Sequence, residues 1–319
     1  MRVLAAALLL ISSLTCLAQD YPAKNVTIVV PYPAGGPTDQ LARLIASRFA
    51  DKLGRTFIVE NVSGGGTTIG TGRVARAAPD GHTLLLHNLQ ISANVALYPK
   101  LQYDTEKDLA AVAFINRNPL VLVGRKTLAP GTLGELIAYM RANSFSMAHP
   151  GSGSSGHLAT ALFAQAAKVT PVQVPYRGGA PMVQDLLGDH VDLLFGTPQQ
   201  LAPLVASGQL KAYGVTATER YPQFPAAASL VAALGPKLEI FYWHALFAPA
   251  ATPKPVVDKL NAVVQGVLDD AALMKSWADT GVSPYPENER SPQAAQALFR
   301  SEIARWGEVV RENKIQPVD

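Results

Sequence analysis

The strongest constraint on the fold is a repeated alternation of short β-branched runs, Gly/Pro/Ser loops and segments with helical spacing. The run NVTIVV at 25–30 precedes the loop PYPAGGPTD, and the apolar residues from Leu41 to Phe49 then share one helical face. The same order recurs after TFIVENV at 56–62 and after FSMAH at 145–149. This alternation predicts an α/β protein with mostly parallel sheets flanked by helices.

Two extended apolar runs are each followed by a turn and an amphipathic helix, one at 118–128 and one from Phe241. We interpret them as crossovers, so that the chain enters a second lobe near Val123 and returns near Ala245. The expected organisation is a signal peptide at 1–18, a discontinuous first lobe at 19–122 plus 246–319, and a second lobe at 123–245. The similar segments VPYPAGGP (30–37) and VPYRGGAP (174–181), each between a strand and a helix, support two related lobes.

The N-terminus has the order of parts of a secretory signal peptide. Arg2 precedes an uncharged run from Val3 to Leu14, which is shorter than the roughly 20 residues that span a bilayer. Cleavage is expected after Ala18, which makes the mature protein exported. It also removes Cys16, the only cysteine, and with it any disulfide, thiolate metal site or cysteine nucleophile. The net charge of +3 is spread along the chain, so nucleic acid is not an expected partner.

The stretch HPGSGSSGH at 149–157 contains G-x-G-x-x-G, the pattern of a dinucleotide-binding loop. Its context differs from that of such loops: the preceding strand is weak, Pro150 stands directly before the first glycine, and no acidic residue occurs between Glu135 and Asp185. No Gly-Lys-Ser/Thr follows any loop, so a Walker A motif is absent as well. We therefore expect no nucleotide cofactor.

Four Gly/Ser/Thr loops lead into predicted helices. The first-turn N–H groups of a helix lack intrahelical acceptors and carry partial positive charge, so such a loop can cradle a carboxylate as readily as a phosphate. Loops at the carboxyl ends of strands share one sheet edge, and two facing lobes would bring all four into one cleft. The alternative is that the glycines only make tight turns, and Arg177 is either a carboxylate ligand or a solvated loop arginine. The loops are Ala34–Thr38, Gly64–Thr68, Ser152–His157 and Arg177–Ala180.

The residues give less support to an enzymatic function. Ser154 or Ser155, with His149 or His157 as base and Asp185 as orienting acid, would make a hydrolase, but G-x-S-x-G is absent. The six histidines form no H-E-x-x-H motif, so no metal site is expected. Tyr242 and Trp243 are assigned either to the core or to ligand contact. We expect a binding protein and not an enzyme.

Seven segments, in order along the mature chain, resemble the substrate-binding receptors of tripartite tricarboxylate transporters, the Bug-type family. They are PYPAGGPTDQLAR, VENVSGGGTTIGTGRVARAAPDGHTLL, LQYDTEKDLAAVAFINRNPLVLV, GSGSSGHLATALF, VPYRGGAPMVQDLLGDHVDLLF, WHALFAPAATPKPVVDKLN and EIARWGEVV. The resemblance implies a two-lobed periplasmic binding protein, type II-like, with two crossover strands. It also implies a small carboxylate held in the cleft and transient delivery to membrane permease subunits by a monomeric receptor.

The resemblance also implies a set of ligand-binding residues. Where relatives commonly carry Asp after this V-D-x-x-F strand, Gly196 stands here, which argues against a ligand ammonium. The alternatives are a sensory accessory that presents the ligand to a membrane histidine kinase and, more remotely, the secreted serine hydrolase. The expected ligand shell is Ala34, Gly35, Thr38, Gly66, Thr67, Thr68, Asn88, Ser92, Ser154, Ser155, His157, Tyr176, Arg177 and Ala180.

Overall fold

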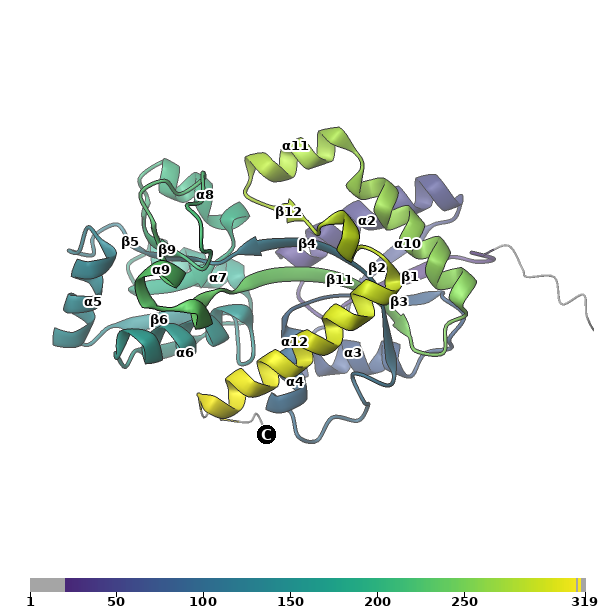
Figure 1. The fold of residues 1–319 in the computed structure, drawn as a ribbon, viewed down its shortest axis with the longest axis horizontal. Helices are drawn as coiled ribbons and strands as arrows, with labels where there is room; N and C mark the ends of the chain where they lie inside the picture. Colours follow the sequence, from purple (N-terminus) through teal and green to yellow (C-terminus); the bar gives the residue numbers. More distant parts are fainter. Residues whose placement is uncertain (1–20, 314, 317–319) are drawn as a thin grey trace, which may run out of the picture.

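The structure is a computed structural model that describes residues 21–313 and 315–316. Its backbone forms two six-stranded sheets, each covered by helices on both faces (Figure 1). The expected signal peptide lies outside the described residues. Within them, no helix has the length and apolar character needed to cross a membrane.

The first sheet has the strand order β12-β4-β11-β3-β1-β2. Strand β1 pairs in parallel with β2 and β3, whereas β4 and β3 each pair antiparallel with β11. The first sheet is therefore mixed, and each of its antiparallel pairs includes β4 or β11. The strands are β1 (Val26–Val30), β2 (Phe57–Asn61), β3 (Thr83–Asn88), β4 (Leu109–Pro119), β11 (Phe241–Pro249) and β12 (Ser283–Pro284).

The second sheet has the order β10-β9-β5-β8-β6-β7. Strand β6 pairs in parallel with β7 and β8, and β5 runs antiparallel to β8 and β9. Its strands are β5 (Val121–Arg125), β6 (Ser146–His149), β7 (Val172–Pro175), β8 (Leu193–Gly196), β9 (Leu210–Val215) and β10 (Ala228–Ser229).

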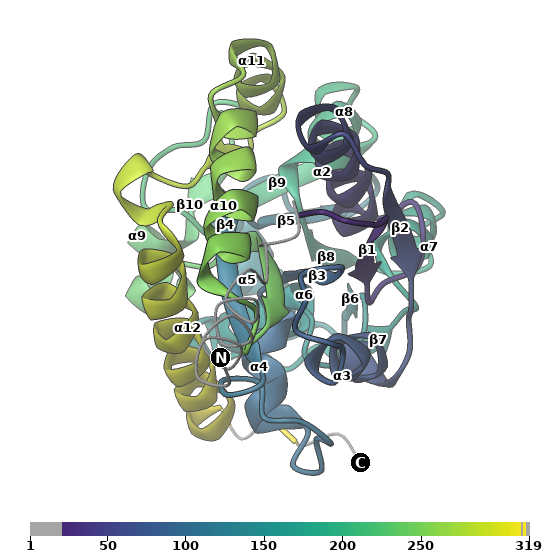
Figure 2. The same ribbon diagram turned by 90° about the vertical axis from the view of Figure 1, so that its right-hand side faces the viewer.

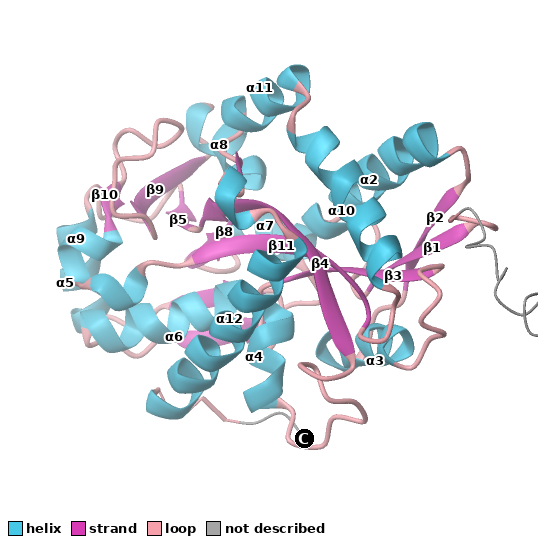
Figure 3. Ribbon diagram, turned by 45° about the vertical axis from the view of Figure 1, so that its right-hand side comes forward, coloured by secondary structure: helices cyan, strands magenta, loops and turns pink. Residues whose placement is uncertain are grey.

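Helices α2, α10 and α11 cover one face of the first sheet, and α3, α4 and α12 cover the other (Figure 3). On the second sheet, α5, α6 and α9 lie on one face and α7 and α8 on the opposite face. The helices are α2 (Pro37–Leu53), α3 (Thr68–Ala75), α4 (Gln90–Leu97), α5 (Leu133–Ala142), α6 (Ser155–Ala167), α7 (Gly179–Leu187), α8 (Pro198–Ala206), α9 (Leu230–Leu234), α10 (Lys254–Leu268), α11 (Ala271–Asp279) and α12 (Pro292–Glu312), with 3-10 turns η1 (Gly65–Thr67), η2 (Pro236–Leu238) and η3 (Glu287–Glu289).

Two crossings connect the sheets. Strand β4 ends at Pro119, and β5 begins in the other sheet at Val121; the return is made by β11, which begins at Phe241. The strands thus change sheet a few residues before the expected positions, Val123 and Ala245. The division into two lobes at those boundaries stays a prediction about folding units, and below "first lobe" and "second lobe" denote the elements of the first and second sheet.

The buried apolar residues join the lobes on one side of the molecule only. One cluster runs continuously from α12 and α4 of the first lobe to α5 and α6 of the second. On the opposite side, the cluster under α2 and α10 and the cluster under α7 and α8 are separate. Because apolar contact holds one side together and does not bridge the other, a crevice can form between α2 and the pair α7 and α8.

After the apolar run HTLLLHN, the sequence predicts a loop over Asn88–Ser92, and that prediction is wrong. Strand β3 continues to Asn88, and α4 begins at Gln90. Leu89 occupies the N-cap position of α4 and no side chain caps it, so the usual Ser, Thr, Asp or Asn signal of a helix start is missing from the sequence.

Candidate functional site

A cavity of about 270 Å³ lies between the two lobes, at the carboxyl ends of the parallel strands. Three of the four glycine loops line it: Ala34–Thr38, the α6 start at Ser154–Gly156, and Arg177–Ala180. The similar segments at 30–37 and 174–181 contribute to opposite walls, one from each lobe. The start of α8, at Thr197 and Gln200, also lines the cavity.

The first turn of α2 is open toward this cavity. Gly36 is its N-cap residue, Pro37 follows, and no side chain caps the helix. The loop is fixed from behind by Asp39, which accepts hydrogen bonds from the Gly35 N–H (2.9 Å) and from Arg43 Nε (3.0 Å). Although burial opposes it, bonds from Arg43, Gly35 and Asn61 hold the pKa of Asp39 below its ordinary value. Asp39 is therefore an ionised anchor of the loop.

The starts of α7 and α8 are open in the same way. Gly178, with φ 112°, is the N-cap residue of α7, and Thr197 is that of α8; neither helix has a side-chain cap. Pro198 stands at the first position of α8, where a missing N–H removes no helical bond. Three uncapped helix starts thus face one cavity with the positive ends of their dipoles.

The start of α6 differs because its own side chains occupy it. Ser154 Oγ accepts from the His157 N–H (3.3 Å) and donates to the Gly151 carbonyl (2.6 Å). His157 Nδ1 in turn accepts from the Gly153 N–H at 3.1 Å, and its ring lies 4.7 Å from that of His149. Burial lowers the pKa of His157 to about 4, so the ring is neutral and can act as this acceptor.

Beneath the cavity lies a network of neutral polar groups on the crossover strand β11 and on β3. Asn88 Nδ2 donates to Tyr242 Oη (3.0 Å) and to Thr38 Oγ1 (3.2 Å), and Tyr32 Oη donates to Asn88 Oδ1 (2.7 Å). His244 lies 2.8 Å from Asn116 Oδ1 through Nδ1 and 3.1 Å from Thr38 Oγ1 through Nε2.

Asn116 Oδ1 can only accept, which makes His244 Nδ1 the donor and its Nε2 the acceptor. The network is then satisfied without any ion.

Burial sets the protonation of this network. It lowers the pKa values of His87 and His244 to about 3 and raises that of Tyr242 to about 12. At neutral pH both imidazoles are uncharged and Tyr242 keeps its phenolic proton. Tyr242 lines the cavity as a neutral residue, with its hydroxyl bonded to Asn88 and Thr38.

Arg177 is the only formally charged side chain among the residues that line the cavity. It is exposed, and none of the ion pairs found among the described residues includes it. Open helix starts, hydroxyls, amides and one unpaired guanidinium together favour an anion over a cation or a sugar.

The predicted ligand residues divide between the cavity and its surroundings. Those that line the cavity are Ala34, Gly35, Thr38, Asn88, Ser154, Ser155, Arg177 and Ala180; those that do not are Gly66, Thr67, Thr68, Ser92, His157 and Tyr176. The contacts of both groups with a ligand stay predictions.

Apart from Ser92, the residues of the second group are hydrogen-bonded to other parts of the protein. The Gly66 carbonyl accepts from Asn94 Nδ2 (2.9 Å) and from Gln90 Nε2 (3.3 Å), which places the first turn of α4 between this loop and the cavity. Thr67 bonds to Asn94 and His87, and Thr68 Oγ1 to the Gly65 carbonyl. Ser92 is buried in α4, and Tyr176 Oη donates to Asp185 at 2.6 Å.

Gln90 also connects the two lobes. Its Nε2 lies 3.2 Å from the Ser152 carbonyl of the second lobe, in addition to the Gly66 carbonyl of the first. The 64–68 loop is thereby linked to the cleft through Gln90 without lining it.

Several cavity residues were not among the predicted ligand shell. Tyr32, Gln90, Thr197, Gln200 and Tyr242 all line it. The Thr197-Pro198 pair was a usable signal, since Thr at the N-cap and Pro after it mark a helix start. On β11, Tyr242 faces the cavity whereas the indole of its neighbour Trp243 donates to buried Glu302 (2.6 Å), as alternation along a strand requires.

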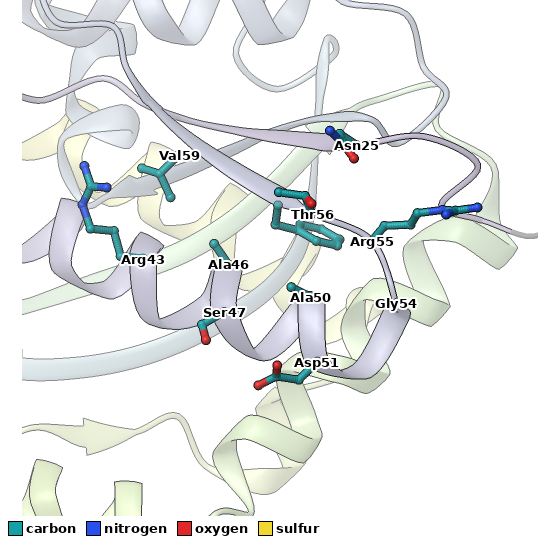
Figure 4. Close-up of a pocket in the computed structure, with 11 residues that line it drawn as sticks. Asn25, Arg43, Ala46, Ser47, Ala50, Asp51, Gly54, Arg55, Thr56 and Val59 are labelled. Atoms are coloured by element: carbon teal, nitrogen blue, oxygen red, sulfur yellow. The ribbon is translucent and has the colours of Figure 1, made fainter.

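A wider depression, of about 640 Å³, lies on the outer side of the first lobe along α2 and β2 (Figure 4). Its sides carry Arg43, Asp51 and Arg55 and it reaches the carboxyl end of α2 at Gly54. No glycine loop or helix start opens into it, so it lacks the donors that distinguish the interlobe cavity.

The hydrolase arrangement does not form. Ser154 Oγ donates to a main-chain carbonyl, and Asp185 is bonded to Tyr176. His149 and His157 accept main-chain N–H groups through Nδ1. In the part of the chain that the structure describes, no group of three or more His, Cys, Asp or Glu side chains is placed to hold a metal ion.

Two mixed sheets, two crossover strands and a polar interlobe cavity define the class of two-lobed periplasmic binding proteins. More narrowly, the chain belongs to the tripartite tricarboxylate transporter family receptors, whose family model matches residues 41–315. These are solute-binding proteins and not enzymes.

Solved structures agree with this assignment. The periplasmic binding protein BugD is 34% identical with a TM-score of 0.86, and 93% of this chain covers 100% of it. MatC from Rhodopseudomonas palustris, with bound malate, is 38% identical with a TM-score of 0.84, at 91% and 100% coverage. Rpa4515 of R. palustris, with adipate, is 33% identical with a TM-score of 0.86, at 93% and 100% coverage.

Proposed function

We propose that this protein is an exported receptor that closes around a small di- or tricarboxylate, or an aromatic acid, and delivers it to the membrane permease of a tripartite tricarboxylate transporter. The observation that carries the proposal is the convergence of uncapped helix starts from both lobes on one cavity. Arg177 is the only formal charge in that cavity's lining.

The chemistry of the cavity supports a carboxylate ligand. An oxygen at the α2 start would receive N–H groups of the first lobe, and one at the α7 and α8 starts would receive those of the second. Each charge-assisted hydrogen bond contributes roughly 1.5–3 kcal/mol, so several of them hold a dianion without a buried ion pair. Because the donors come from both lobes, the ligand stabilises the closed arrangement over an open one.

Two further observations limit the size of the ligand. The cavity of about 270 Å³ is small, just below the roughly 300–1,000 Å³ typical of small-molecule sites. The similar proteins MatC and Rpa4515 contain malate and adipate. Both acids are small dicarboxylates, one of the ligand classes that we propose here.

Isothermal titration of the purified protein with succinate, malate, adipate, citrate and benzoate tests this proposal, with glucose and putrescine as neutral and cationic controls. We expect heat from one or more of the acids and none from the controls. Binding of the controls alone would refute the carboxylate proposal. Native mass spectrometry of the protein as purified would identify any acid carried through purification.

Delivery and export are tested separately. A strain that lacks this protein should lose uptake of the bound acid and regain it with the intact gene. N-terminal sequencing of the exported protein should begin at Gln19. Size-exclusion chromatography should give the mass of a monomer.

A further inference from the structure

A polar contact joins the lobes at the end of α11, on the side where no buried apolar cluster bridges them. The loop between β9 and β10, in the second lobe, meets the end of α11, in the first. Helices α11 and α8 lie at the same end of the molecule in two perpendicular views (Figure 1, Figure 2). A crevice of about 370 Å³, lined by α2, α8 and α11, adjoins this contact at Thr280, so open space separates the lobes there.

Two neutral side chains of the second lobe make the contact. Tyr221 Oη donates a hydrogen bond to the Gly281 carbonyl, and Gln223 Nε2 donates one to the Ala278 carbonyl at 2.7 Å. Ala278 lies in the last turn of α11, where carbonyl groups lack the N–H partners that a continuing helix would supply. We call these four residues the clasp.

Gly281 lets the two lobes approach closely at the clasp. Its φ of 74° lies in the left-handed region, which favours glycine. A Cβ added to it would lie 2.8 Å from Tyr221 Cε1, 3.0 Å from Pro198 Cβ and 3.2 Å from Gln223 Oε1. All three neighbours belong to the second lobe, so a side chain at position 281 would push the lobes apart.

The clasp differs from the contact on the opposite side of the molecule. There, one continuous apolar cluster runs from α12 and α4 to α5 and α6, and separating it would expose carbon surface to water. The Tyr221 ring, by contrast, packs against the apolar cluster of its own lobe. Separating the clasp breaks two hydrogen bonds whose groups water can then satisfy. Opening of the lobes at the clasp is therefore the less costly movement.

We infer, on the basis of the proposed function, that Tyr221 and Gln223 are positioning residues, which hold the lobes closed around a ligand that they do not touch. Neither residue lines the ligand cavity. A ligand that joins the lobes brings the two halves of the clasp together, and the clasp then slows ligand release. Because apparent affinity falls with the fraction of molecules that are closed, loss of the clasp raises Kd.

The first test compares two tyrosines. Tyr221→Phe removes the phenolic donor and keeps the ring. Tyr213→Phe is the matched control, because Tyr213 Oη also donates to a main-chain carbonyl, that of Pro130 at 2.8 Å, but within the second lobe. The probe is whichever of succinate, malate and adipate binds the native protein most tightly. We expect Tyr221→Phe to raise its Kd about fivefold, equivalent to about 1 kcal/mol, and Tyr213→Phe to leave it within about 1.5-fold.

Binding kinetics distinguish a clasp from a general loss of structure. Stopped-flow measurements should assign the effect of Tyr221→Phe to a faster koff, with kon nearly unchanged. Both donors of the clasp are neutral, and burial raises the pKa of Tyr221 to about 12. The effect should therefore be the same at low and high salt, unlike that of a change at Arg177.

The second test inserts a methyl group between the lobes. Gly281→Ala is compared with Gly208→Ala, because Gly208 has a similar φ of 69° and an added Cβ there would meet nothing within 4 Å. Both substitutions strain the backbone, so both should lower the melting temperature. Only Gly281→Ala should raise Kd, by at least about tenfold.

A distance measurement reports closure directly. The chain from Gln19 onward has no cysteine, so fluorescent labels can be attached at Lys52→Cys on α2 and Gln184→Cys on α7, which are both exposed. The chosen acid should raise energy transfer between these labels. At the same subsaturating acid concentration, the rise should be smaller in Gly281→Ala than in Gly208→Ala.

The outcomes separate the two proposals. If Tyr221→Phe and Gly281→Ala leave Kd and koff at the native values, the clasp is refuted and the carboxylate receptor stands. The same conclusion follows if Tyr213→Phe and Gly208→Ala weaken binding as much as their counterparts do. If the native protein binds none of the three acids, the carboxylate proposal and the clasp are both refuted.

Discussion

Helices of this protein begin in two different ways, according to where they start. On the outer surface, α5 begins with a capping box between Thr132 and Glu135, and α11 and α12 are capped by Asp270 and Ser291. At the cleft, α2, α7 and α8 have no side-chain cap. The outer helices have a side-chain acceptor for their first-turn N–H groups, whereas the cleft helices have none.

A missing cap alone does not identify a ligand site. Helix α10 also begins without a side-chain cap, at Pro253, and lies away from the cavity. The start of α6 lines the cavity and yet is capped by Ser154. What distinguishes the cleft is that several open starts from two lobes converge. The comparison therefore predicts that changes at outer starts alter stability, and changes at cleft starts alter binding.

Lowering the pH should have the largest effect on stability. The cleft floor depends on neutral imidazoles, whereas the outer helix caps do not. The folded-state pKa of His87 and of His244 is about 3, against about 6.5 in the unfolded chain. Between these values the unfolded chain binds more protons, so the free energy of unfolding falls as the pH falls. From about pH 6.5 to 4.5 the two imidazoles should together remove roughly 4 kcal/mol.

Urea unfolding over this pH range measures the loss. His244→Asn should remove at most about a third of the pH dependence, since His87 and His157 also have lowered pKa values and remain. The outer cap Asp270, whose pKa is lowered mainly by the Leu273 N–H, stays ionised in this range. A native protein whose stability does not change with pH would contradict the buried neutral network.

A carboxylate side chain introduced at the start of α2 should weaken ligand binding strongly without loss of stability. Gly36 has extended backbone angles, φ −77° and ψ 171°, and an added Cβ would meet nothing nearer than the Pro33 oxygen at 3.8 Å. Gly36→Asp should cap α2 and repel a ligand carboxylate. We expect Kd to rise at least about 100-fold, equivalent to roughly 3 kcal/mol, with an unchanged or higher melting temperature.

Gly36→Asn is the matched control, because Asn caps a helix equally well and carries no charge. It should weaken binding less than Asp does, by titration calorimetry. Equal effects of Asp and Asn would show that occupation of the N–H groups, and not charge, decides affinity.

Replacing the single charge in the cavity lining should have a smaller effect. Arg177→Gln removes a charge-assisted contact and should raise Kd on the order of tenfold, whereas Arg177→Lys should keep part of the affinity. Titrations at low and high salt should show a weaker salt dependence for Arg177→Gln. An unchanged Kd would make Arg177 a solvated loop residue.

The smallest change is expected at an outer start. Thr132→Ala removes the N-cap of α5, in which the Glu135 N–H bonds Thr132 Oγ1 at 3.2 Å. Unfolding free energy should fall by about 1 kcal/mol, measured by urea unfolding, and Kd should not change. A change in affinity would mean that the outer starts are coupled to the cleft.

Much of the fold was predictable because each element has a local signal. β-branched runs, glycine loops and helical spacing locate most strands and helices, and the apolar runs at β4 and β11 predict the two crossings. The exact residues where the strands change sheet were not predictable, since β4, Leu120 and β5 form one continuous extended stretch with no turn signal between them.

The cleft was predictable in part, from the loops at 34–38, 154–156 and 177–180. The position of the 64–68 loop was not, because it depends on α4, whose start at Leu89 carries no capping signal. Gln90 and Asn94 of that helix take up the Gly66 carbonyl. Tyr242 could be given no role from sequence, since only the direction of its side chain on β11 decides between core and cavity.

The position of β11 also sets the order in which the chain can complete its structure as it is synthesised. This strand, residues 241–249, lies between β4 and β3 in the first sheet. Until it has been made, the first sheet lacks its middle and both flanking strands have an unpaired edge. The second sheet is built from one uninterrupted stretch, 121–229, and can form earlier. During synthesis the second sheet can therefore be completed before the first, although the first sheet is begun earlier.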